Sequence, residues 1–312
     1  MKAVGMTQFG GPEVLSLVDL PEPQVGQGQV RIRVHAAAVN PTDTLLRSGA
    51  RPERYAGVPP PYVPGMDAAG VLDDIGEAVT TDLRVGDHVM AIVVPEGSHG
   101  AYSQLLVVPA ESVVRTPTGA SDAQAATLPM NGLTARLALD LLGLEPGETL
   151  AVTGAAGAVG GYVVELAKAD GLRVIADASE SDEALVRRLG ADLVVRRGPG
   201  FSDAIREAAH RGVDGLVDAA LLNELAVGAV RDGGRIATVR SFEGDGERGI
   251  TFHPVLVRNY ARENAKLDRL RQQVEDGELT LRVARVIPAE RAAEAHRLLE
   301  AGGTRGRLVI EL

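Results

Sequence analysis

The stretch 149-TLAVTGAAGAVGGYVVELAKADGLRVIADAS-179 decides the fold of this chain. An apolar run, Thr149 to Thr153, leads into a glycine-rich turn, 154-GAAGAVG-160, and then into a segment with apolar residues at helical spacing. A second apolar run, Val174 to Ala176, follows that segment. The order strand, tight turn, helix, strand predicts two neighbouring parallel strands joined by a helix.

The glycine-rich turn also has the features of a dinucleotide-binding site. Glycines let the backbone approach a pyrophosphate closely, and the start of the next helix offers free N–H groups and the positive end of its dipole. A glycine pattern alone is a weak signal, but here the strands and the helix fall where the dinucleotide fingerprint requires them. We therefore predict dinucleotide binding rather than a purely structural turn. The predicted contacts are Gly154, Ala156, Gly157, Ala158, Val159 and Gly160.

Length and composition are those of a globular protein with two domains. The chain has 312 residues, of which 24% are charged and 45% hydrophobic. No apolar run approaches the length of a membrane span and the N-terminus does not resemble a secretory signal, so we expect a cytoplasmic protein. The formal charge of −10 argues against nucleic acid as the main partner.

The sequence contains no cysteine. This excludes disulfides, thiolate nucleophiles and sulfur-ligated zinc. The six histidines are scattered, and no pair has the spacing of metal ligands. We therefore expect no metal site, and any redox chemistry must come from a bound organic cofactor.

Two regions differ in texture. Residues 1–118 hold short apolar runs separated by Gly and Pro, which predicts a β-rich, barrel-like domain; the stretch from Arg51 to Pro64 holds five prolines and predicts an irregular loop. Residues 119–258 alternate helical and strand patterns, which is typical of a doubly wound parallel sheet. After them we expect a long polar helix over 259–276 and two short strand-like runs, 279–286 and 307–312, that flank another helix. Because these strands are too few for a domain, we assign 259–312 to the first domain.

Several stretches match a known family in its order. They are 36-AAAVNPTDTLLRSG-49, 64-PGMDAAGVLDDIG-76, 86-GDHVMAI-92, 127-TLPMNGLTARLAL-139, 152-VTGAAGAVGGYVVELAKADG-171, 189-LGAD-192 and 295-AHRLLEAGGTRGRLVI-310. By these motifs the chain resembles a zinc-independent medium-chain dehydrogenase/reductase of the quinone oxidoreductase (zeta-crystallin-like) group. The resemblance implies an α/β protein with a GroES-like catalytic domain (1–118 and 259–312), a Rossmann domain (119–258) and an active site between them. It also implies a homodimer or tetramer, of which we expect the homodimer.

The comparison with zinc-dependent relatives supports the absence of a metal. Those relatives place a Cys near position 40 and a Gly-His-Glu near 65–67, whereas this chain has Asn40 and Gly65-Met66-Asp67. The chain also lacks the four-cysteine structural lobe of those relatives.

The end of the second strand bears on the choice of cofactor. In NAD-binding units an acidic residue there binds both ribose hydroxyls, but the family alignment puts Ala178 at that position and not Asp177. A small residue leaves space for a 2′-phosphate, to which Ser179 can donate and beside which Arg197 lies in related reductases. We therefore favour NADPH. The alternatives are an NAD-type ribose contact by Asp177, and a solvated turn at Arg196 and Arg197.

The resemblance places Asn40, Asp43 and Thr134 near the nicotinamide. Asn40 and Thr134 are candidate hydrogen-bond donors to the cofactor or to the substrate oxygen, whereas for Asp43 a role as helix cap is about as well supported. Relatives that carry a Tyr two residues after this Asp differ from this chain, which has Leu45. Tyr55 and Tyr62 are possible replacements as proton donor, although packing is the more common role of tyrosine.

Further contacts follow from the fold. Ligands lie beyond the carboxyl ends of parallel strands, so Ala219 after the fourth strand and Val239 and Arg240 after the fifth should border the nicotinamide ribose and carboxamide. Together these features predict an NADPH-dependent reductase of quinones or enones, with an enoyl reductase for a polyketide-like or thioester intermediate as one variant. The alternative is a non-catalytic NADPH-binding scaffold or sensor.

Overall fold

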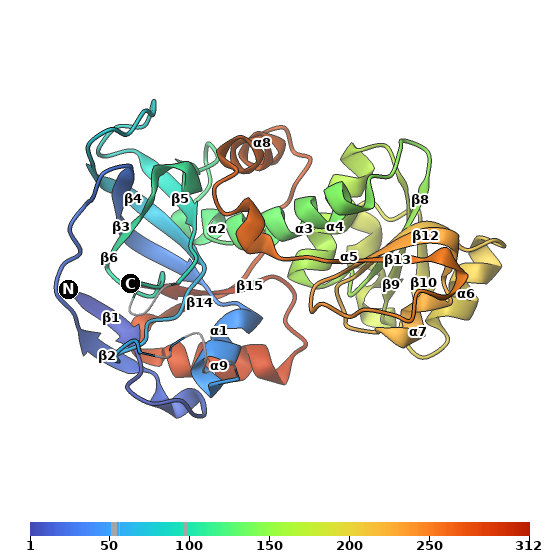
Figure 1. The fold of residues 1–312 in the computed structure, drawn as a ribbon, viewed down its shortest axis with the longest axis horizontal. Coiled ribbons are helices and arrows are strands. Elements are labelled where there is room, and N and C mark those ends of the chain that lie inside the picture. Colours follow the sequence, from blue (N-terminus) through green and yellow to red (C-terminus); the bar gives the residue numbers. More distant parts are fainter. Residues whose placement is uncertain (51–54, 56, 96–98) are drawn as a thin grey trace. The chain divides into compact units, whose positions relative to one another are not determined.

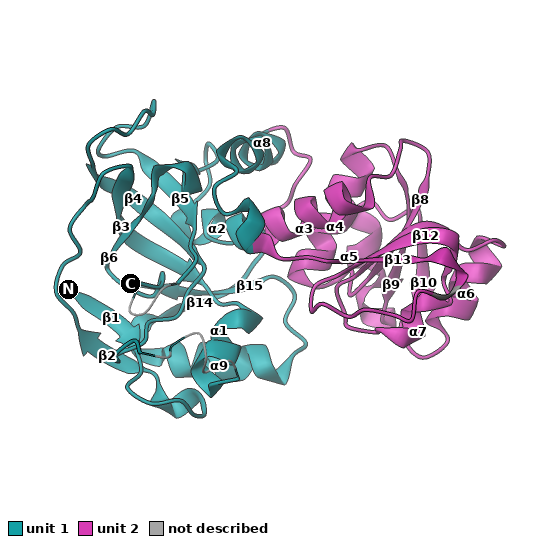
Figure 2. Cartoon of the chain, viewed as in Figure 1, with its two compact units in different colours: residues 1–130, 258–275, 281–312 teal, residues 131–257, 276–280 magenta. Residues whose placement is uncertain are grey.

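The computed structural model describes residues 1–50, 55, 57–95 and 99–312. These residues form two compact units: unit 1 contains 1–130, 258–275 and 281–312, and unit 2 contains 131–257 and 276–280 (Figure 1, Figure 2). Each unit has its own sheet and its own hydrophobic core. The predicted class, an α/β protein with a β-rich domain and a doubly wound parallel-sheet domain, is confirmed.

Unit 1 is built on a seven-stranded sheet with the order β14-β15-β3-β4-β5-β7, in which β6 also pairs with β3, and on a separate antiparallel pair, β1 with β2. The strands are β1 (Lys2–Gly5), β2 (Ser16–Asp19), β3 (Gln29–Ala38), β4 (Asp67–Ile75), β5 (His88–Ile92), β6 (Leu105–Pro109), β7 (Val113–Arg115), β14 (Val283–Pro288) and β15 (Arg307–Glu311). The C-terminal β15 runs parallel to β14 and antiparallel to β3, so segments from both ends of the chain share one sheet.

The long strand β3 is central because its sequence alternates. Val30, Ile32 and Val34 are buried while the residues between them are more exposed, which is the period of a strand with one face on a core. The register between β3 and β4 shifts near Val34, where a side chain at Gly70 would lie 2.0 Å from the carbonyl oxygen of Arg33. Glycine at position 70 therefore permits the close approach of the two backbones.

The helices in the described residues of unit 1 are α1 (Pro41–Ser48), α2 (Asp122–Ala125), α8 (Asn264–Glu275) and α9 (Ala292–Ala301). The capping residue of α1 is Asn40, with Pro41 in the first helical position, where the missing N–H of proline costs nothing. Of the predicted loop from Arg51 to Pro64, positions 51–54 and 56 lie outside the described residues.

Unit 2 contains a six-stranded parallel sheet with the order β10-β9-β8-β11-β12-β13. Its strands are β8 (Thr149–Thr153), β9 (Arg173–Ala178), β10 (Leu193–Arg196), β11 (Val213–Asp218), β12 (Val230–Thr238) and β13 (Thr251–Pro254). Numbered along the chain, the strands lie in the order 3-2-1-4-5-6, which is that of a dinucleotide-binding doubly wound sheet. The order in which strands are added reverses between β8 and β11, although these two strands are parallel.

The helices of unit 2 are α3 (Pro129–Leu142, which starts at the end of unit 1), α4 (Ala158–Ala169), α5 (Glu183–Arg188), α6 (Phe201–Ala208) and α7 (Glu224–Val227). Short 3-10 turns cover Pro12–Val14, Ala110–Ser112, Glu180–Asp182, Glu247–Gly249, Val257–Tyr260 and Ala289–Arg291. Helix α4 is buried from Gly160 to Ala167 and packs on β8 and β9, because its sequence is apolar on nearly every side. The predicted strand–turn–helix–strand at 149–179 is thus present.

Some boundaries differ from the expected ones. Residues 119–130, assigned from the sequence to the second domain, lie in unit 1, because α2 packs on β3 and β4 and the backbone N–H of Met130 donates to Asp67. The expected helix over 259–276 is divided into the 3-10 turn Val257–Tyr260 and α8. The amide of Asn264 donates to the carbonyl of Val113, which ties the start of α8 to β7.

None of the helices in the described part of the chain combines the length and the apolar character that crossing a membrane requires.

Candidate active site

The predicted cofactor contacts lie at one edge of the unit 2 sheet. Because all six strands are parallel, their carboxyl ends meet at the same edge. The glycine turn follows β8, Ser179 follows β9, Arg197 follows β10, Ala219 follows β11, and Val239 and Arg240 follow β12. Most of these residues are half-buried or exposed, and so they are accessible to a ligand at this edge.

The turn after β8 has the shape of an anion site. Gly154 has a φ of +65°, a conformation that favours glycine, and its carbonyl accepts a hydrogen bond of 2.8 Å from the backbone N–H of Gly157. Gly157 caps α4 without a side-chain hydrogen bond. A Cβ atom at Gly160 would lie 2.3 Å from the carbonyl oxygen of Gly154, so only glycine lets the helix begin this close to the turn. The N–H groups of the first turn of α4 are therefore not used by a capping side chain, which suits a pyrophosphate.

The loop after β11 is tied to the same edge by two buried side chains. The Thr153 hydroxyl donates to Asp218 over 2.6 Å and accepts from the backbone N–H of Ala220. Asp218 also accepts from the backbone N–H groups of Leu222 and Asn223. Two residues of this loop have a positive φ: Leu221 at 60° and Asn223 at 51°. Non-glycine residues rarely adopt this conformation, and they do so most often where a loop is held in place for function.

The carboxylate of Asp177 contacts Arg197, one of the predicted phosphate contacts. It is fully buried, accepts from the backbone N–H of Ala155 at 3.2 Å, and pairs with Nε of Arg197 at 3.3 Å. Strand β9 ends one residue later, at Ala178, in agreement with the predicted strand end. The hydroxyl of Ser179 donates to Asp182 over 2.6 Å and lies 3.0 Å from the hydroxyl of Ser181.

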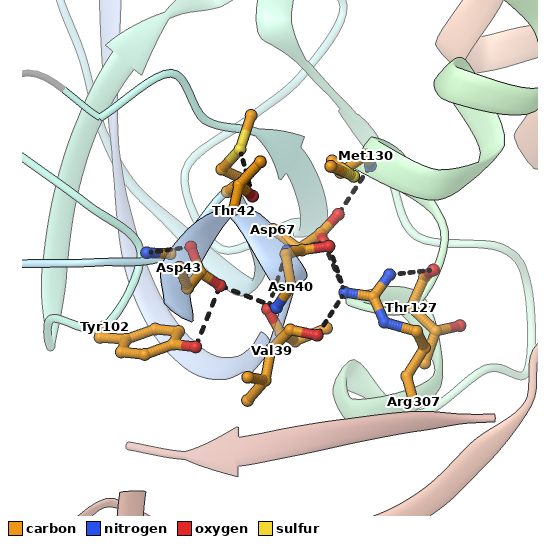
Figure 3. A network of polar contacts seen from close by, with 12 residues as sticks. Val39, Asn40, Thr42, Asp43, Asp67, Tyr102, Thr127, Met130 and Arg307 are labelled. Atoms are coloured by element: carbon orange, nitrogen blue, oxygen red, sulfur yellow. Dashed lines mark hydrogen bonds and ion pairs between the residues drawn. The ribbon is translucent and has the colours of Figure 1, made fainter. Parts of the chain in front are cut away.

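A second polar cluster lies in unit 1 around Asn40 (Figure 3). Its side-chain amide is fully buried and donates to the carbonyl of Ala38 and, over 2.9 Å, to Asp67, while its oxygen accepts from Nη2 of Arg307 over 2.7 Å. Both N–H groups and the carbonyl of this amide therefore already have partners. Its predicted contact with cofactor or substrate stays a prediction.

Arg307 is the cation of this cluster. Its Nη2 pairs with Asp67 at 3.0 Å and also donates to the carbonyl of Val39. Asp67 in addition accepts from the backbone N–H of Met130 at 2.7 Å. Burial raises the pKa of Asp67, while the nearby Arg307 charge, Asn40 and Met130 lower it. Asn40 and Asp67 together hold the Arg307 guanidinium.

Among the side chains that the structure describes, no group of three or more His, Cys, Asp or Glu has an arrangement that fits a metal ion.

Asp43 takes part in the capping of α1, but from the third helical position: it completes a capping box with the N-cap Asn40, and the helix begins before Asp43, not after it. Its carboxylate accepts from the backbone N–H of Asn40 at 2.8 Å and of Gly65 at 3.0 Å, and from the hydroxyl of Tyr102 at 3.1 Å. Burial nevertheless raises the pKa of Asp43 to about 7: the three hydrogen bonds lower the pKa by less than burial raises it, and the Asp67 charge raises it further. Its predicted position near the nicotinamide stays a prediction.

The Tyr102 hydroxyl also lies 3.3 Å from Nε2 of His296 on α9. Burial, followed by repulsion from Arg47, lowers the pKa of His296 to about 3, so that the imidazole is neutral in the folded protein at neutral pH. The pKa of Tyr102 is well above 10 for the same reason, burial, and because of the Asp43 carboxylate.

Tyr55 lies in an aromatic group of unit 1, and Thr134 lies on α3 of unit 2. Tyr55 belongs to an aromatic group with Phe9 and Tyr62, at ring-centroid distances of 6.1 and 5.1 Å. Phe9 and Tyr62 are stacked 5.2 Å apart. Thr134 is buried on α3 and belongs to unit 2, whereas the other predicted catalytic residues belong to unit 1. The predicted roles of both residues stay predictions.

No role was predicted for Arg307, Tyr102 or His296, and Asp67 was named only within the Gly65-Met66-Asp67 stretch that departs from zinc-dependent relatives. Asp67, His296 and Arg307 lie within stretches that carried the family resemblance, which is the one signal that could have found them. Tyr102 has no such signal, because its partners come from distant parts of the chain.

Two family models match the chain. The model described as "Alcohol dehydrogenase GroES-like domain" matches residues 26–118, and the model described as "Zinc-binding dehydrogenase" matches residues 189–310. The first match agrees with the expected type of the β-rich domain.

Relatives match over nearly the whole chain. The chain is 30% identical to a quinone oxidoreductase of Mus musculus, over 100% of this chain and 98% of the relative. It is 31% identical to the chloroplastic NADPH-dependent alkenal/one oxidoreductase of Arabidopsis thaliana, over 99% of this chain and 79% of the relative.

Solved structures share the fold. A structure described as an NAD-dependent alcohol dehydrogenase has a TM-score of 0.87 at 31% identity, and it is covered completely, as is this chain. A mycobacterial protein in complex with NADPH has a TM-score of 0.87 at 27% identity, again with complete coverage of both chains.

Proposed function

Because this chain belongs to the quinone oxidoreductase family of medium-chain dehydrogenase/reductases, we propose that it transfers a hydride from NADPH to a quinone or an α,β-unsaturated carbonyl compound. Family membership makes the chain an oxidoreductase. Relatives that reduce quinones and alkenals support the substrate class, and a neighbour in complex with NADPH supports the cofactor. A homodimer is part of the same proposal.

The observation that carries the proposal is the carboxyl edge of the unit 2 sheet. The first turn of α4 presents backbone N–H groups without a capping side chain, which suits the pyrophosphate. Two strands away, Arg197 uses Nε for Asp177, and its two terminal guanidinium nitrogens have no hydrogen-bond partner among the described residues. A forked pair of donors of this kind fits a 2′-phosphate.

The position of Asp177 favours NADPH over NADH. An NAD-type ribose contact needs a carboxylate that presents its oxygens to the two hydroxyls. Here the carboxylate is fully buried, and its two oxygens are engaged by Ala155 and Arg197. A ribose contact would require both hydroxyls to reach a carboxylate that is fully buried and that already accepts from Ala155 and Arg197.

The bound cofactor would supply the hydride that adds to the electrophilic carbon of the substrate. The chain has to hold the two reactants in register, keep water away from them, and donate hydrogen bonds to the substrate oxygen, on which negative charge develops. We propose the Thr134 hydroxyl as such a donor. Asn40 and Asp43 would shape the pocket through the hydrogen bonds that cap α1, Tyr55 would contact the substrate, and a proton from solvent would complete the reduction.

Initial rates of NADPH and NADH oxidation with a panel of simple enones and quinones test the proposal. We expect turnover with several acceptors, and a kcat/KM for NADPH at least about tenfold above that for NADH, as one phosphate–arginine contact supplies. A preference for NADH would transfer the ribose contact to Asp177. Tight NADPH binding without oxidation of the cofactor by any acceptor would favour a scaffold or sensor instead.

A further inference from the structure

Asp177 connects two separate parts of the cofactor edge. One carboxylate oxygen accepts from the backbone N–H of Ala155, inside the glycine turn, and the other pairs with Nε of Arg197, beyond the end of β10. Asp177 faces Val195 in the register of β9 and β10, and the backbone N–H of Arg197 donates to Ala178. The side chain of Arg197 therefore returns along the end of β9 to reach the carboxylate.

This contact fixes the Nε end of the Arg197 guanidinium and leaves its two terminal nitrogens accessible to a ligand. Its side chain is 39% exposed, whereas that of Asp177 is 0% exposed, so the anchor is buried and the anchored group faces solvent. Because Nε points to Asp177, the remaining two nitrogens form a pair of donors with a set direction. A long side chain that is held in place before binding loses less conformational entropy when it meets its ligand.

We propose that Asp177 is a positioning residue for NADPH: it directs Arg197 at the 2′-phosphate and holds the glycine turn, and its carboxylate does not itself touch the ribose. The inference rests on the proposed use of NADPH. In NAD-binding units an acidic residue at this strand end binds the ribose hydroxyls. Here the Asp177 carboxylate would instead favour the cofactor with a 2′-phosphate, because it orients Arg197.

Replacing Asp177 by Asn separates the two contacts. An amide has a single oxygen, which can accept from the rigid backbone N–H of Ala155, and its NH2 group then faces the Nε–H of Arg197, to which it cannot bond. The glycine turn keeps its hydrogen bond while Arg197 loses its anchor. Asp177→Thr, with one oxygen and no charge on a residue suited to a strand, provides a second variant with the same expected outcome.

Asp214 provides a matched control. It also accepts from a backbone N–H, of Thr149 at 2.8 Å, and from an arginine Nε, of Arg231 at 2.7 Å. However, it lies near the start of β11 and contacts the first residue of β8, at the opposite edge of the same sheet. Asp214→Asn should likewise keep the backbone contact and lose the arginine contact, at a place that the cofactor does not reach.

The test is calorimetric titration with 2′,5′-ADP and with 5′-AMP, which differ only in the 2′-phosphate. We expect the wild type to bind 2′,5′-ADP at least about tenfold more tightly. In Asp177→Asn and Asp177→Thr the ratio of the two affinities should fall about three- to tenfold, with 5′-AMP affinity nearly unchanged. In Asp214→Asn the ratio should match that of the wild type.

The outcomes separate this inference from the proposed function. If the wild type prefers 2′,5′-ADP and the ratio stays the same or rises in folded Asp177 variants, the inference is wrong and the NADPH proposal stands. A rise would mean that Asp177 competes with the phosphate for Arg197. If the wild type binds the two nucleotides equally, the NADPH proposal fails, and the inference fails with it.

Discussion

Asp43 and His296 lie on either side of the Tyr102 hydroxyl, at 3.1 and 3.3 Å, and burial disfavours the charged form of both. Between about pH 4 and 6.5 the folded protein holds Asp43 protonated and His296 neutral, whereas the unfolded chain has the reverse. Each state binds one proton at this pair, so the two effects on the pH dependence of stability cancel. The other charged groups that act on the pair are Asp67, which raises the pKa of Asp43, and Arg47, which lowers that of His296.

Asp43→Asn should remove the contribution of Asp43 to the pH dependence of stability and leave that of His296. The pKa of Asp43 is about 7 in the folded protein and 3.8 ordinarily, so as the pH rises through this window the unfolded chain loses a proton first and stability falls. The variant lacks this loss. Its free energy of unfolding relative to wild type should rise by up to about 1.4 kcal/mol per pH unit between the two pKa values. Urea unfolding at several pH values measures the difference; a constant difference would contradict the raised pKa.

His296→Gln should show the opposite slope. The pKa of His296 falls from 6.5 to about 3 on folding, so as the pH drops below 6.5 the unfolded chain takes up a proton and stability is lost. Gln keeps an amide that can bond the Tyr102 hydroxyl and does not titrate. Relative to wild type, this variant should gain stability on acidification, in the same urea experiment. Parallel pH profiles for variant and wild type would exclude a buried neutral imidazole.

At the scale of elements, the start of α4 is set by contact of two backbones. There is no room for a side chain at Gly160, because a Cβ atom there would lie 2.3 Å from the oxygen of Gly154 and 2.9 Å from Cα of Ala155. Neither of these backbone atoms can move without displacing the turn. The turn and the helix therefore form one rigid unit at the proposed pyrophosphate site, and its geometry depends on the absence of a side chain at Gly160.

Gly160→Ala should lose both stability and cofactor binding. We expect an overpacking cost of about 1–3 kcal/mol and much weaker NADPH binding, since the turn must move away from the helix. Gly200→Ala is the control: Gly200 precedes α6 with a φ of −82° and has nothing within 4 Å of its Cβ position. Urea unfolding and calorimetric titration should distinguish the two. Normal NADPH affinity in folded Gly160→Ala would argue against this turn as the pyrophosphate site.

At the scale of the whole molecule, unit 1 is completed by the last residues of the chain. Arg307 on β15 reaches Asn40 and Asp67, which lie 267 and 240 positions earlier in the sequence. The contact is buried on both sides, with side-chain exposures of 5% for Arg307 and 0% for Asp67. The buried Asp67 of unit 1 is thus paired with Arg307, which follows unit 2 in the sequence.

Arg307→Met should destabilise the protein strongly, because it leaves the buried Asp67 charge without its cation. We expect a loss of about 3–5 kcal/mol in the free energy of unfolding. Arg285→Met, which removes a half-exposed pair between Arg285 and Glu294, should cost at most about 1 kcal/mol. Adding Asp67→Asn to Arg307→Met should recover part of the loss. Equal costs for the two arginines, measured by urea unfolding, would refute a structural role for the buried pair.

The predictable part of this protein is the part with short sequence separation. The glycine turn, α4 and the ends of β8 and β9 follow from patterns within 149–179, since strand and helix periods and glycine requirements are local. A capping role for Asp43 was a predicted alternative for the same reason, since a capping box spans four residues, but the N-cap is Asn40 and the helix begins before Asp43.

The sequence by itself determined the βαβ unit, the alternation of strands and helices that is typical of a doubly wound parallel sheet, and the absence of cysteine chemistry, because these depend on residue type and local spacing. Only the tertiary structure decided what Asp177 contacts and that Asn40, Asp67 and Arg307 share one buried cluster. Such clusters form when strands from distant segments pair, and each charge is tolerated only because another segment brings its partner. That pairing is a property of the packed sheet, and no pattern within a single stretch of the chain encodes it.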